Sequence, residues 1–566
     1  MLDPNPHRRR PLWTLLPAAL AAAILAVALG GAASATPLGT SSAPDARLAV
    51  TGEIIVAFKP NVSATAQNEL LGRVDAKRKR RFDRIHGALV SVAPGKVGQT
   101  IRSLERDRRV AYAEPNFLLF ADDHGGTPND PSFHQLWGLN NFGQTVNGIA
   151  GTPDADIDAR EAWSVSTGSP SVVVAVIDTG VDLLHPDLTA NVWVNQGENC
   201  AGCRTNGIDD DDNGYVDDWR GWDWVNGDGN PADDHGHGTH VAGTIAAVGN
   251  NALGVAGVTW STKIMALKFL SAAGTGTTAD AISAILYANA KGVPILNNSW
   301  GGDAFSQALL DAIEQTDANG ALFVAAAGNS FANTDLSPHY PSGYEAANVI
   351  AVGASDATDR RSWFSNYGVR TVDVSAPGSN ILSTWPSASY RSLDGTSMAA
   401  PHVAGSAALM KAVQADASGT GLKALLLRTV DQVSALGGAS RTAGRLNVDR
   451  AARCLGEPKA WIESPAPGFE VDAGEPLAIR VLAASCASPA GVSVSATANG
   501  NPLELAARGD GLYAAAYAPA AGAVTISITA IAGDRTDTQG VSGTAIQNYE
   551  ITPGGPSVTV TTQAAA

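Results

Sequence analysis

Three patterns of apolar and polar positions follow one another along this chain of 566 residues. Residues 50–115 alternate short strand-like and helix-like stretches, which is typical of a small α+β unit with helices on one face of an antiparallel sheet. Between about 125 and 452, continuous apolar runs at 171–177, 321–326 and elsewhere are separated by helix-like stretches. Because continuous apolar strands are buried on both faces, this part predicts a parallel sheet covered by helices on both sides.

The last pattern begins near residue 457 and consists of short alternating strands punctuated by Gly, Pro and Asn-Gly. Such a pattern over about 100 residues predicts an immunoglobulin-like β-sandwich. The final residues, 553–566, contain Gly-Gly-Pro and repeated Val, Thr and Ala, and we expect a tail there.

The N-terminus has the three parts of an export signal. Residues 8–10 (Arg-Arg-Arg) supply the positive region, residues 12–29 are almost wholly apolar, and residues 33–35 (Ala-Ser-Ala) fit the small-residue cleavage site. We therefore predict a cleaved signal peptide and export from the cell. The alternative is an uncleaved membrane anchor, since about 18 apolar residues nearly span a bilayer. No later segment of the sequence is long and apolar enough to do so, and no stable membrane insertion is expected.

Charge excludes one class of partner. The formal net charge is −16 and the sequence pI is about 5.0, whereas nucleic-acid binding requires clustered Lys and Arg. One basic run, Lys-Arg-Lys-Arg-Arg at 77–81, is expected to be a solvated loop or a docking patch for an acidic partner domain. We therefore expect no nucleic-acid partner.

Four cysteines are present, at positions 200, 203, 454 and 486. In an oxidising compartment they would form two disulfides, and sequence alone does not choose among the three possible pairings. Proximity in the chain favours Cys200 with Cys203 and Cys454 with Cys486. A zinc site is the alternative, but no histidines at ligand spacing flank the two pairs.

Three segments place a reactive side chain at the end of a strand or the start of a helix. Asp178 ends an apolar strand, His237 stands at the start of a helical run, and Ser397 begins another helix. Singly, these residues are typical of a turn, a histidine cluster and a helix cap. Together they supply what a serine nucleophile needs, namely an imidazole base and a carboxylate that orients and stabilises it. We expect Pro401 in the first turn of the Ser397 helix, where its missing N–H costs little.

Asn329 adds an amide near the end of the apolar strand at 321–326. Acyl transfer develops negative charge on the substrate oxygen, and donors held near that oxygen often make the largest catalytic contribution. The Asn329 side chain and the backbone N–H of Ser397 are the candidate donors. The N-terminus of the Ser397 helix adds a favourable dipole.

Four motifs built around these residues resemble the signature blocks of the subtilisin-like serine proteases. They are Val-Ile-Asp178-Thr-Gly, His237-Gly-Thr-His-Val-Ala-Gly-Thr, Ala-Ala-Gly-Asn329 and Gly-Thr-Ser397-Met-Ala-Ala-Pro-His-Val-Ala-Gly. They stand in the family's order and the resemblance covers roughly residues 130–452. It implies a doubly wound α/β fold and endopeptidase activity through an acyl-enzyme. It also implies a triad of Asp178, His237 and Ser397, in which the base is the histidine followed by Gly-Thr-His.

The resemblance also assigns substrate-binding segments. Asn-Asn-Ser299-Trp-Gly-Gly is similar to the strand that pairs with the substrate backbone, which implies extended protein or peptide substrates. The walls of the primary specificity pocket would be Ser299, Trp300 and Gly301 on one side and Ala326 to Gly328 on the other. Because these walls are small and uncharged, we expect large apolar residues at P1, the residue whose carbonyl is attacked.

Two regions are predicted to bind structural calcium. In the first, Asp209, Asp211 and Asn213 are spaced two apart and are followed by a glycine and Asp217, as in the opening of an EF-hand-type loop. An arginine stands where that motif has its closing Glu, so a solvated acidic loop is the alternative. Calcium is preferred because so many clustered carboxylates repel one another without a cation.

The second calcium region is implied by the resemblance alone. Asp187 lies where members of the family often place a ligand, with Gln135 and the Asn250-Asn251 turn as possible partners. The loop departs from the best-known members by about one residue, which leaves the individual ligands open.

The resemblance extends to residues 50–115, which are similar to the inhibitory propeptide of these proteases. The resulting organisation is a signal peptide at 1–35, a propeptide at 36–122, a peptidase domain at 123–455, an immunoglobulin-like sandwich at 456–552 and a tail at 553–566. We predict a secreted, monomeric serine endopeptidase that cleaves off its own propeptide between Leu118 and Asn129. The alternative is a catalytically inactive binding or adhesion protein on the same fold.

Overall fold

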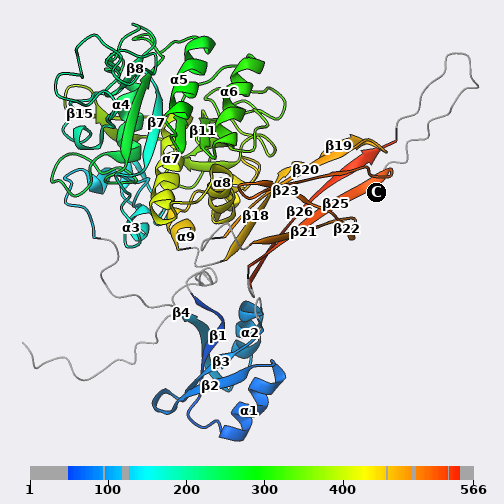
Figure 1. The fold of residues 1–566 in the computed structure, drawn as a ribbon. Helices are drawn as coiled ribbons and strands as arrows, with labels where there is room; N and C mark the ends of the chain where they lie inside the picture. Colours follow the sequence, from blue (N-terminus) through cyan, green and yellow to red (C-terminus); the bar gives the residue numbers. More distant parts are fainter. Residues whose placement is uncertain are drawn as a thin grey trace, which may run out of the picture. The chain divides into compact units, whose positions relative to one another are not determined.

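The computed structural model describes residues 49–93, 96–117, 126–453, 457–485, 492–532 and 535–547. It forms two compact units, Met1–Phe120 and Ala121–Ala566 (Figure 1). The predicted signal peptide, the tail, most of the predicted cleavage region and the cysteines at 454 and 486 lie outside the described residues. Of the described residues, none belongs to a helix with both the length and the apolar character needed to cross a membrane.

The first unit is a four-stranded antiparallel sheet with two α-helices, as predicted for an α+β unit. Its strands are in the order β2-β3-β1-β4. Ile54 and Val56 of the sheet share a core with Leu70 and Leu104 of the helices. The elements are β1 (Ala49–Phe58), α1 (Ala64–Arg73), β2 (Lys77–Phe82), η2 (Asp83–Ile85), β3 (Gly87–Ser91), α2 (Val97–Glu105) and β4 (Val110–Phe117).

The basic run at 77–81 lies in β2, an edge strand, so the prediction of a loop is wrong. The run forms a strand because its backbone pairs with β3, while its side chains stay largely in solvent. Charged side chains on an edge strand oppose pairing with the edge of a second sheet.

The second unit is built around a nine-stranded sheet in the order β16-β17-β13-β12-β11-β10-β7-β9-β8. Neighbouring strands are parallel except for the edge pair β16–β17. The strands are β7 (Val173–Asp178), β8 (Gly221–Asp223), β9 (Lys263–Lys268), β10 (Ile295–Asn298), β11 (Leu322–Ala326), β12 (Val349–Ser355), β13 (Val374–Pro377), β16 (Asp431–Gln432) and β17 (Gly444–Arg445).

Helices cover both faces of this sheet, as predicted. Val174 and Val176 of β7 belong to one core, and Ala175 and Ile177 to another, because successive strand residues face opposite sides. Helices α4, α7, α8 and α9 contribute to the first core, and α5 and α6 to the second. The helices are α3 (Ala159–Ala162), α4 (His237–Ala246), α5 (Thr278–Ala290), α6 (Gln307–Ala318), α7 (Thr396–Val413), α8 (Gly419–Arg428) and α9 (Val448–Ala452).

Short elements complete this part of the chain. Two small hairpins pair β5 with β6 and β14 with β15. The remaining elements are η3 (Phe133–Gln135), β5 (Thr145–Val146), β6 (Ile149–Ala150), η4 (Thr189–Asn191), β14 (Ile381–Trp385), β15 (Ser389–Leu393) and η5 (Ser434–Leu436).

The C-terminal part consists of two sheets, in the orders β18-β20-β24-β23 and β19-β26-β25-β21-β22. Ile462 and Val481 of the first sheet share one core with Ile526 and Ile528 of the second. The predicted short strands are therefore present, and the immunoglobulin-like class stays a prediction. The strands are β18 (Pro458–Ser464), β19 (Phe469–Asp472), β20 (Leu477–Ser485), β21 (Ser493–Ala498), β22 (Asn501–Leu503), β23 (Ala506–Gly509), β24 (Leu512–Tyr517), β25 (Gly522–Ala532) and β26 (Arg535–Ile546).

A buried charge cluster joins β18 to the nine-stranded domain. Lys423 of α8 is 1% exposed and lies 3.0 Å from a carboxylate oxygen of Glu463 in β18. Burial alone raises the pKa of Glu463, but the charges of Lys423 and Arg441 outweigh it and leave that pKa lowered. Trp461 of β18 and Leu482 of β20 also belong to the core of the nine-stranded domain. The C-terminal sheets are thus packed against α8 by apolar and ionic contacts together.

Glu463→Ala is expected to lower the free energy of unfolding by about 3–5 kcal/mol, because it leaves the buried ammonium of Lys423 without its nearest carboxylate. Denaturant titration measures this change. Glu457→Ala is the matched control, since that carboxylate pairs with Lys459 at 54% exposure and should cost about 1 kcal/mol or less. Equal losses in the two variants would show that the buried cluster does not stabilise the junction.

Candidate active site

Asp178 is the last residue of β7, at the carboxyl edge of the sheet, and its side chain is fully buried. Its Oδ1 accepts the N–H of Thr179 and the Nδ1–H of His237, both at 2.7 Å. Gly238 makes this approach possible, because a methyl carbon there would overlap the carbonyl oxygen of Gly180 and lie 3.1 Å from Cβ of Asp178. The glycine after the histidine in the motif therefore lets α4 reach the end of the strand.

His237 is the first residue of α4, and Asp233 orders the turn that carries it. The Asp233 carboxylate accepts the N–H groups of Gly236 at 2.8 Å and Thr239 at 2.9 Å. Burial alone lowers the pKa of His237, but the negative charge of Asp178 and its hydrogen bond outweigh burial, so the pKa is raised above 6.5. With Nδ1 bonded to Asp178, Nε2 is the nitrogen left to accept a proton.

Two other histidines in the motif differ from His237. His240 is buried and its Nε2–H donates to the carbonyls of Ile381 at 2.9 Å and Arg391 at 3.0 Å. Burial lowers the pKa of His240 to about 3. His235 is exposed, and its ring centroid lies 6.3 Å from that of His237. The bond to Asp178 therefore distinguishes His237 from both neighbours.

Ser397 lies in the first turn of α7, after the N-cap residue Gly395. Its hydroxyl donates to the carbonyl of Ser299 at 3.0 Å, and the hydroxyl of Ser299 donates to the carbonyl of Ser397 at 2.9 Å. In this structure the Ser397 hydroxyl is thus bonded to Ser299, and a bond to His237 would require it to turn. Bonds between a nucleophile and its base often form fully only in the substrate complex.

Pro401 lies in the second turn of α7, so the prediction of a first-turn position is wrong. A residue with an N–H at this place would donate to the carbonyl of Ser397, which proline cannot do. The hydroxyl of Ser299 supplies the missing donor. The bond from the Ser299 hydroxyl thus satisfies the Ser397 carbonyl, which Pro401 leaves without its helical donor.

Asn329 follows β11, and Thr396 fixes the orientation of its amide. Oδ1 of Asn329 accepts the backbone N–H of Thr396 at 2.8 Å and the Thr396 hydroxyl at 2.9 Å. Because a backbone N–H only donates, the amide oxygen faces Thr396 and Nδ2 faces away from it. His237, Asn329 and Ser397 line one pocket together with Trp385. We call it the nucleophile pocket.

His237 also lines a second pocket, which we call the groove. Ser299, Trp300 and Gly301, which are predicted substrate-binding residues, line it. The segment 273–278 lines it as well. An open groove edged by the end of a strand suits an extended peptide that adds to the strand through its main chain.

Ala326 and Gly328, which the sequence predicts for the opposite wall, do not line this groove. Ala326 is buried in the core of the sheet at 3% exposure. Gly328 has a φ of +99°, in the left-handed region that favours glycine, and its N–H donates to the Thr396 hydroxyl at 3.1 Å. This turn carries the chain from β11 to Asn329.

A cluster of carboxylates lies in the acidic loop between β7 and β8. One oxygen each from Glu198, Asp211 and Asp218 lies within 4.8 Å of the others. Oε2 of Glu198 and Oδ1 of Asp211 are buried and have no hydrogen-bond partner in the described part of the chain. Lys291 supplies one positive charge, 2.9 Å from Asp211. The buried oxygens and the excess of negative charge fit a bound cation.

Of the residues predicted as ligands in this loop, Asp211 belongs to the cluster, and Nδ2 of Asn213 donates to its Asp218 at 2.9 Å. Asp209 accepts the N–H groups of Asn213 at 3.1 Å and Gly214 at 2.6 Å. Asp217 accepts the N–H of Asn206 at 2.9 Å, and the side-chain oxygen of Asn213 accepts the N–H of Tyr215 at 2.8 Å. These three side chains shape the turns of the loop in this structure.

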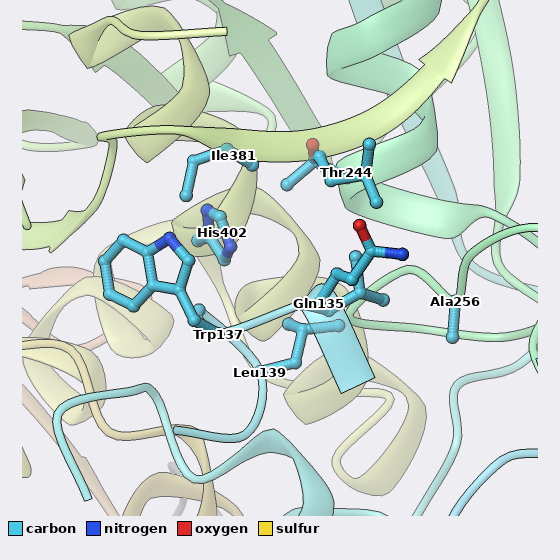
Figure 2. A pocket seen from close by; sticks show the side chains of 10 residues that line it. Gln135, Trp137, Leu139, Thr244, Ala256, Ile381 and His402 are labelled. Carbon is cyan, nitrogen blue, oxygen red and sulfur yellow. The ribbon is translucent and has the colours of Figure 1, made fainter. Parts of the chain in front are cut away.

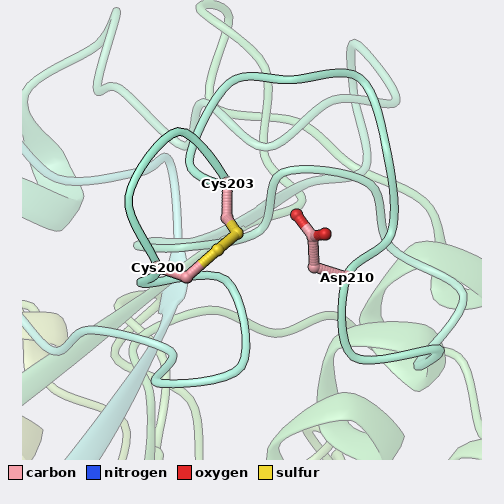
Figure 3. Close-up of side chains that lie close together, drawn as sticks. All are labelled: Cys200, Cys203 and Asp210. Atoms are coloured by element: carbon pink, nitrogen blue, oxygen red, sulfur yellow. A yellow bond between two sulfur atoms is a disulfide. The ribbon is translucent and has the colours of Figure 1, made fainter.

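Cys200 and Cys203 form a disulfide in the same loop, which confirms that predicted pair (Figure 3). Asp210 lies close to both sulfur atoms. Because disulfide sulfurs carry no thiolate, these three residues do not constitute a metal site.

Asp187 is buried and already has three hydrogen-bond donors. Asn251 Nδ2 at 2.8 Å, the N–H of Val255 at 3.0 Å and the hydroxyl of Tyr390 at 2.8 Å all point to its carboxylate. Asp130 is buried nearby, and burial together with the charge of Asp187 raises its pKa. The predicted partner turn thus contacts Asp187, and Asp130 adds a second carboxylate.

Gln135, the other predicted partner of Asp187, lines a small pocket between the segment 135–139, α4 and α7 (Figure 2). Trp137, Thr244 and His402 share that pocket. Burial lowers the pKa of His402 to about 4, and its Nδ1–H donates to the carbonyl of Met398 at 2.8 Å. His402 is therefore a neutral structural residue of the helix that carries Ser397.

Sequence reasoning missed Glu198, Asp218 and Asp130. Glu198 precedes the recognisable loop motif, and Asp218 directly follows the predicted Asp217. Asp130 stands between an Asn and a Pro near the start of the domain, without a motif around it. Only the folded chain brings the first two together and places Asp130 beside Asp187.

The fold and the site define a serine hydrolase built on a parallel α/β sheet. Comparison with known proteins agrees: the subtilase family model matches residues 169–451, half of the chain, and a fervidolysin N-terminal prodomain model matches residues 36–116. The chain belongs to the subtilase family. It is a serine-type endopeptidase with an N-terminal prodomain.

Three relatives illustrate the match. The chain is 36% identical over 390 residues to a thermophilic serine proteinase of Bacillus sp. (strain AK1), which covers 69% of this chain and 84% of that protein. It is 37% identical over 325 residues to thermitase of Thermoactinomyces vulgaris, covering 57% and 99%. It is 35% identical over 372 residues to an extracellular protease of Xanthomonas campestris pv. campestris, covering 62% and 60%.

Proposed function

We propose that Asp178, His237 and Ser397 are the catalytic triad, with Asn329 as a donor to the oxyanion. The observation that carries the proposal is the 2.7 Å hydrogen bond between the buried Asp178 and His237, with Ser397 and Asn329 in the same pocket as that histidine. This combination gives a hydroxyl, a base, a charge that stabilises the base and a donor for the developing oxyanion. A binding protein without catalysis is not favoured, because each of these parts is present.

In the proposed reaction, Nε2 of His237 removes the proton of the Ser397 hydroxyl as Oγ attacks the carbonyl carbon of the peptide bond. Nδ2 of Asn329 and the N–H of Ser397 stabilise the resulting oxyanion. The imidazolium then gives its proton to the leaving amine, which forms the acyl-enzyme. A water molecule, deprotonated by His237, releases the acyl group and restores the hydroxyl of Ser397.

The maturation that we propose is removal of the N-terminal unit by self-cleavage between Leu118 and Asn129. The prodomain match at 36–116 supports a precursor, and its end agrees with the proposed cleavage region. The proposed domain boundaries are those predicted from the sequence. Secretion is supported by the export signal and by a relative described as an extracellular protease. We propose that the mature enzyme is a monomer.

N-terminal sequencing and casein hydrolysis of the wild-type protein beside Ser397→Ala test this function. The wild type should begin within 119–129 and digest casein, whereas the variant should keep its prodomain and be inert. If both proteins are processed alike and neither digests casein, self-maturation by a general endopeptidase is contradicted.

The pH dependence should report on His237. kcat/KM is expected to fall as the pH drops through the raised pKa of His237, because the protonated imidazole no longer accepts the Ser397 proton. The midpoint of this acid limb should lie above 6.5, the ordinary value. A pH series of kcat/KM on a peptide substrate without titrating groups measures it. A midpoint below the ordinary histidine value would contradict the proposed environment.

Calcium is proposed as a structural ion in the acidic loop and beside Asp187. In the loop, Glu198, Asp211 and Asp218 fit it, since two of their buried oxygens have no hydrogen-bond partner within the described residues. Asp209, Asn213 and Asp217 remain predicted ligands of the same region. Beside Asp187, Asp130 supplies the second carboxylate. The ion would neutralise these charges and hold the loops, without a part in the chemical steps.

A chelator is expected to lower the melting temperature, because an ion that binds only the folded protein stabilises it by about 2.7 kcal/mol at a hundredfold excess over its Kd. Thermal unfolding in calcium and in EDTA measures the shift. Glu198→Gln should reduce that shift by removing one loop carboxylate, whereas Glu457→Gln, an exposed position, should keep it. The same melting temperature with and without EDTA would rule out the calcium proposal.

A further inference from the structure

The space beside the nucleophile has a third boundary that the sequence did not predict. Strands β10 and β11 are parallel neighbours, and the segments that follow them, 299–301 and 327–329, both lead to the site. Ser299 bonds Ser397, and Gly328 and Asn329 bond Thr396. The resemblance predicts these two segments as walls of the primary specificity pocket, so under the proposed function the P1 side chain of a substrate that acylates Ser397 enters the gap between them.

The imidazole of His339 lies in this gap, against both segments. A methyl carbon on Gly301 would overlap Cε1 of His339 and lie 2.8 Å from its Nε2. A methyl carbon on Gly328 would lie 3.0 Å from Cδ2 and 3.0 Å from Nε2 of the same ring. The edge of the ring that carries Nε2 is therefore held between the two glycines.

The backbone beside His339 is tied to the wall of the gap. Tyr340 and Gly302 exchange two backbone hydrogen bonds, at 2.7 and 2.8 Å. Gly343 donates its N–H to the carbonyl of His339 at 2.7 Å. These bonds fix the residue next to His339 against the segment that follows β10.

The ring itself is held by Ser342. The Ser342 hydroxyl donates to the His339 carbonyl at 3.0 Å, so the 3.1 Å contact with Nδ1 takes its proton from the ring. Nε2 of the neutral ring is then an acceptor that faces the glycines. Burial lowers the pKa of His339, in agreement with a neutral ring.

We propose that His339 is a specificity-determining residue that shortens the P1 pocket, so that this protease cleaves after small residues such as Ala or Ser. The inference rests on the proposed function. It replaces the expectation of large apolar P1 residues, which was based on the walls at 299–301 and 326–328 and did not include His339. A Phe or Leu side chain would collide with the ring. It would also cover Nε2 with apolar atoms, and a buried acceptor left without a hydrogen bond is unfavourable.

Two peptide p-nitroanilides that differ only in P1, Ala or Phe, test the inference. Wild type should show a kcat/KM for Ala at least about tenfold above that for Phe, a ratio typical of a pocket that lacks room for part of a side chain. In His339→Ala the ratio should move toward Phe by about tenfold or more, through a rise in kcat/KM for Phe. His134→Ala, which changes an exposed histidine bonded to the Pro131 carbonyl, should keep the wild-type ratio.

The outcomes separate the inference from the function on which it rests. A wild type that cleaves after Phe as well as after Ala overturns the inference and leaves the proposed function standing. An unchanged ratio in His339→Ala does the same. A folded wild type that cleaves neither substrate and is not labelled at Ser397 by a phosphonylating reagent overturns both. If His339→Ala does not fold, the wild-type ratio alone still decides.

Discussion

Replacing Ser397 by alanine is expected to lower kcat by about 10⁶, to a residual rate that comes from binding and oxyanion stabilisation alone. The magnitude is known from subtilisin, where removal of the nucleophile costs this much. The reason lies in the site: Ser397 is the hydroxyl in the pocket shared with His237 and Asn329. Alanine removes the nucleophile and one hydrogen bond to the Ser299 carbonyl, while the Ser299 hydroxyl still caps the carbonyl at position 397.

Ser406→Ala is the matched control for this experiment. Ser406 lies in the same helix, and its buried hydroxyl has no hydrogen-bond partner among the residues that the structure describes. Removing an unpaired buried hydroxyl should leave stability and kcat close to wild type. Steady-state kinetics on a peptide substrate, with both variants released from their prodomains in trans, gives the comparison. A Ser397→Ala protein that retains more than a small fraction of wild-type kcat would assign the nucleophile elsewhere.

Replacing Asp178 by asparagine is expected to lower kcat by about 10⁴ with little change in folding. The amide oxygen can still accept the N–H of Thr179, as Oδ1 of Asp178 does at 2.7 Å. The negative charge is lost, however, and that charge raises the pKa of His237 and in the proposed reaction stabilises its imidazolium. The pKa of His237 should therefore fall, and the acid limb of kcat/KM should move to lower pH.

Asp182→Asn serves as the control for Asp178→Asn. Asp182 lies shortly after the same strand and accepts the backbone N–H groups of Leu184 and Ser387. Among the residues that the structure describes, it forms no hydrogen bond with His237. It should leave both kcat and the acid limb where they are. If Asp178→Asn also left the acid limb in place, the carboxylate would not be the group that sets the basicity of His237.

The places of the proposed triad residues in the fold could be predicted because each follows from the sequence around it. Asp178 ends a continuous apolar strand, and His237 and Ser397 begin helices, all features that sequence alone records. The layers of the sheet could be predicted for the same reason, since β7 is apolar at every position before Asp178. The meeting of these residues in one pocket followed from resemblance, because parallel strands bring distant segments together at one edge.

Features that depend on packing between distant segments could not be predicted. The hydroxyl of Ser299 donates to the Ser397 carbonyl in the helix interrupted by Pro401, and the sequence around neither residue predicts that bond. His339 reaches the gap between Gly301 and Gly328 from a loop that carries no motif. The carboxylate cluster of the acidic loop could not be predicted for the same reason, since the fold of a long turn brings the carboxylates of Glu198 and Asp218 together.

Reaction of the mature protein with an active-serine phosphonylating reagent, followed by mass spectrometry of its peptides, tests the central claim most directly. We predict one covalent adduct, on Ser397, which forms in EDTA as well as in calcium and is lost in His237→Ala. A folded protein that takes up no reagent, or that carries the adduct on another residue, would contradict the assignment of Ser397 as the nucleophile.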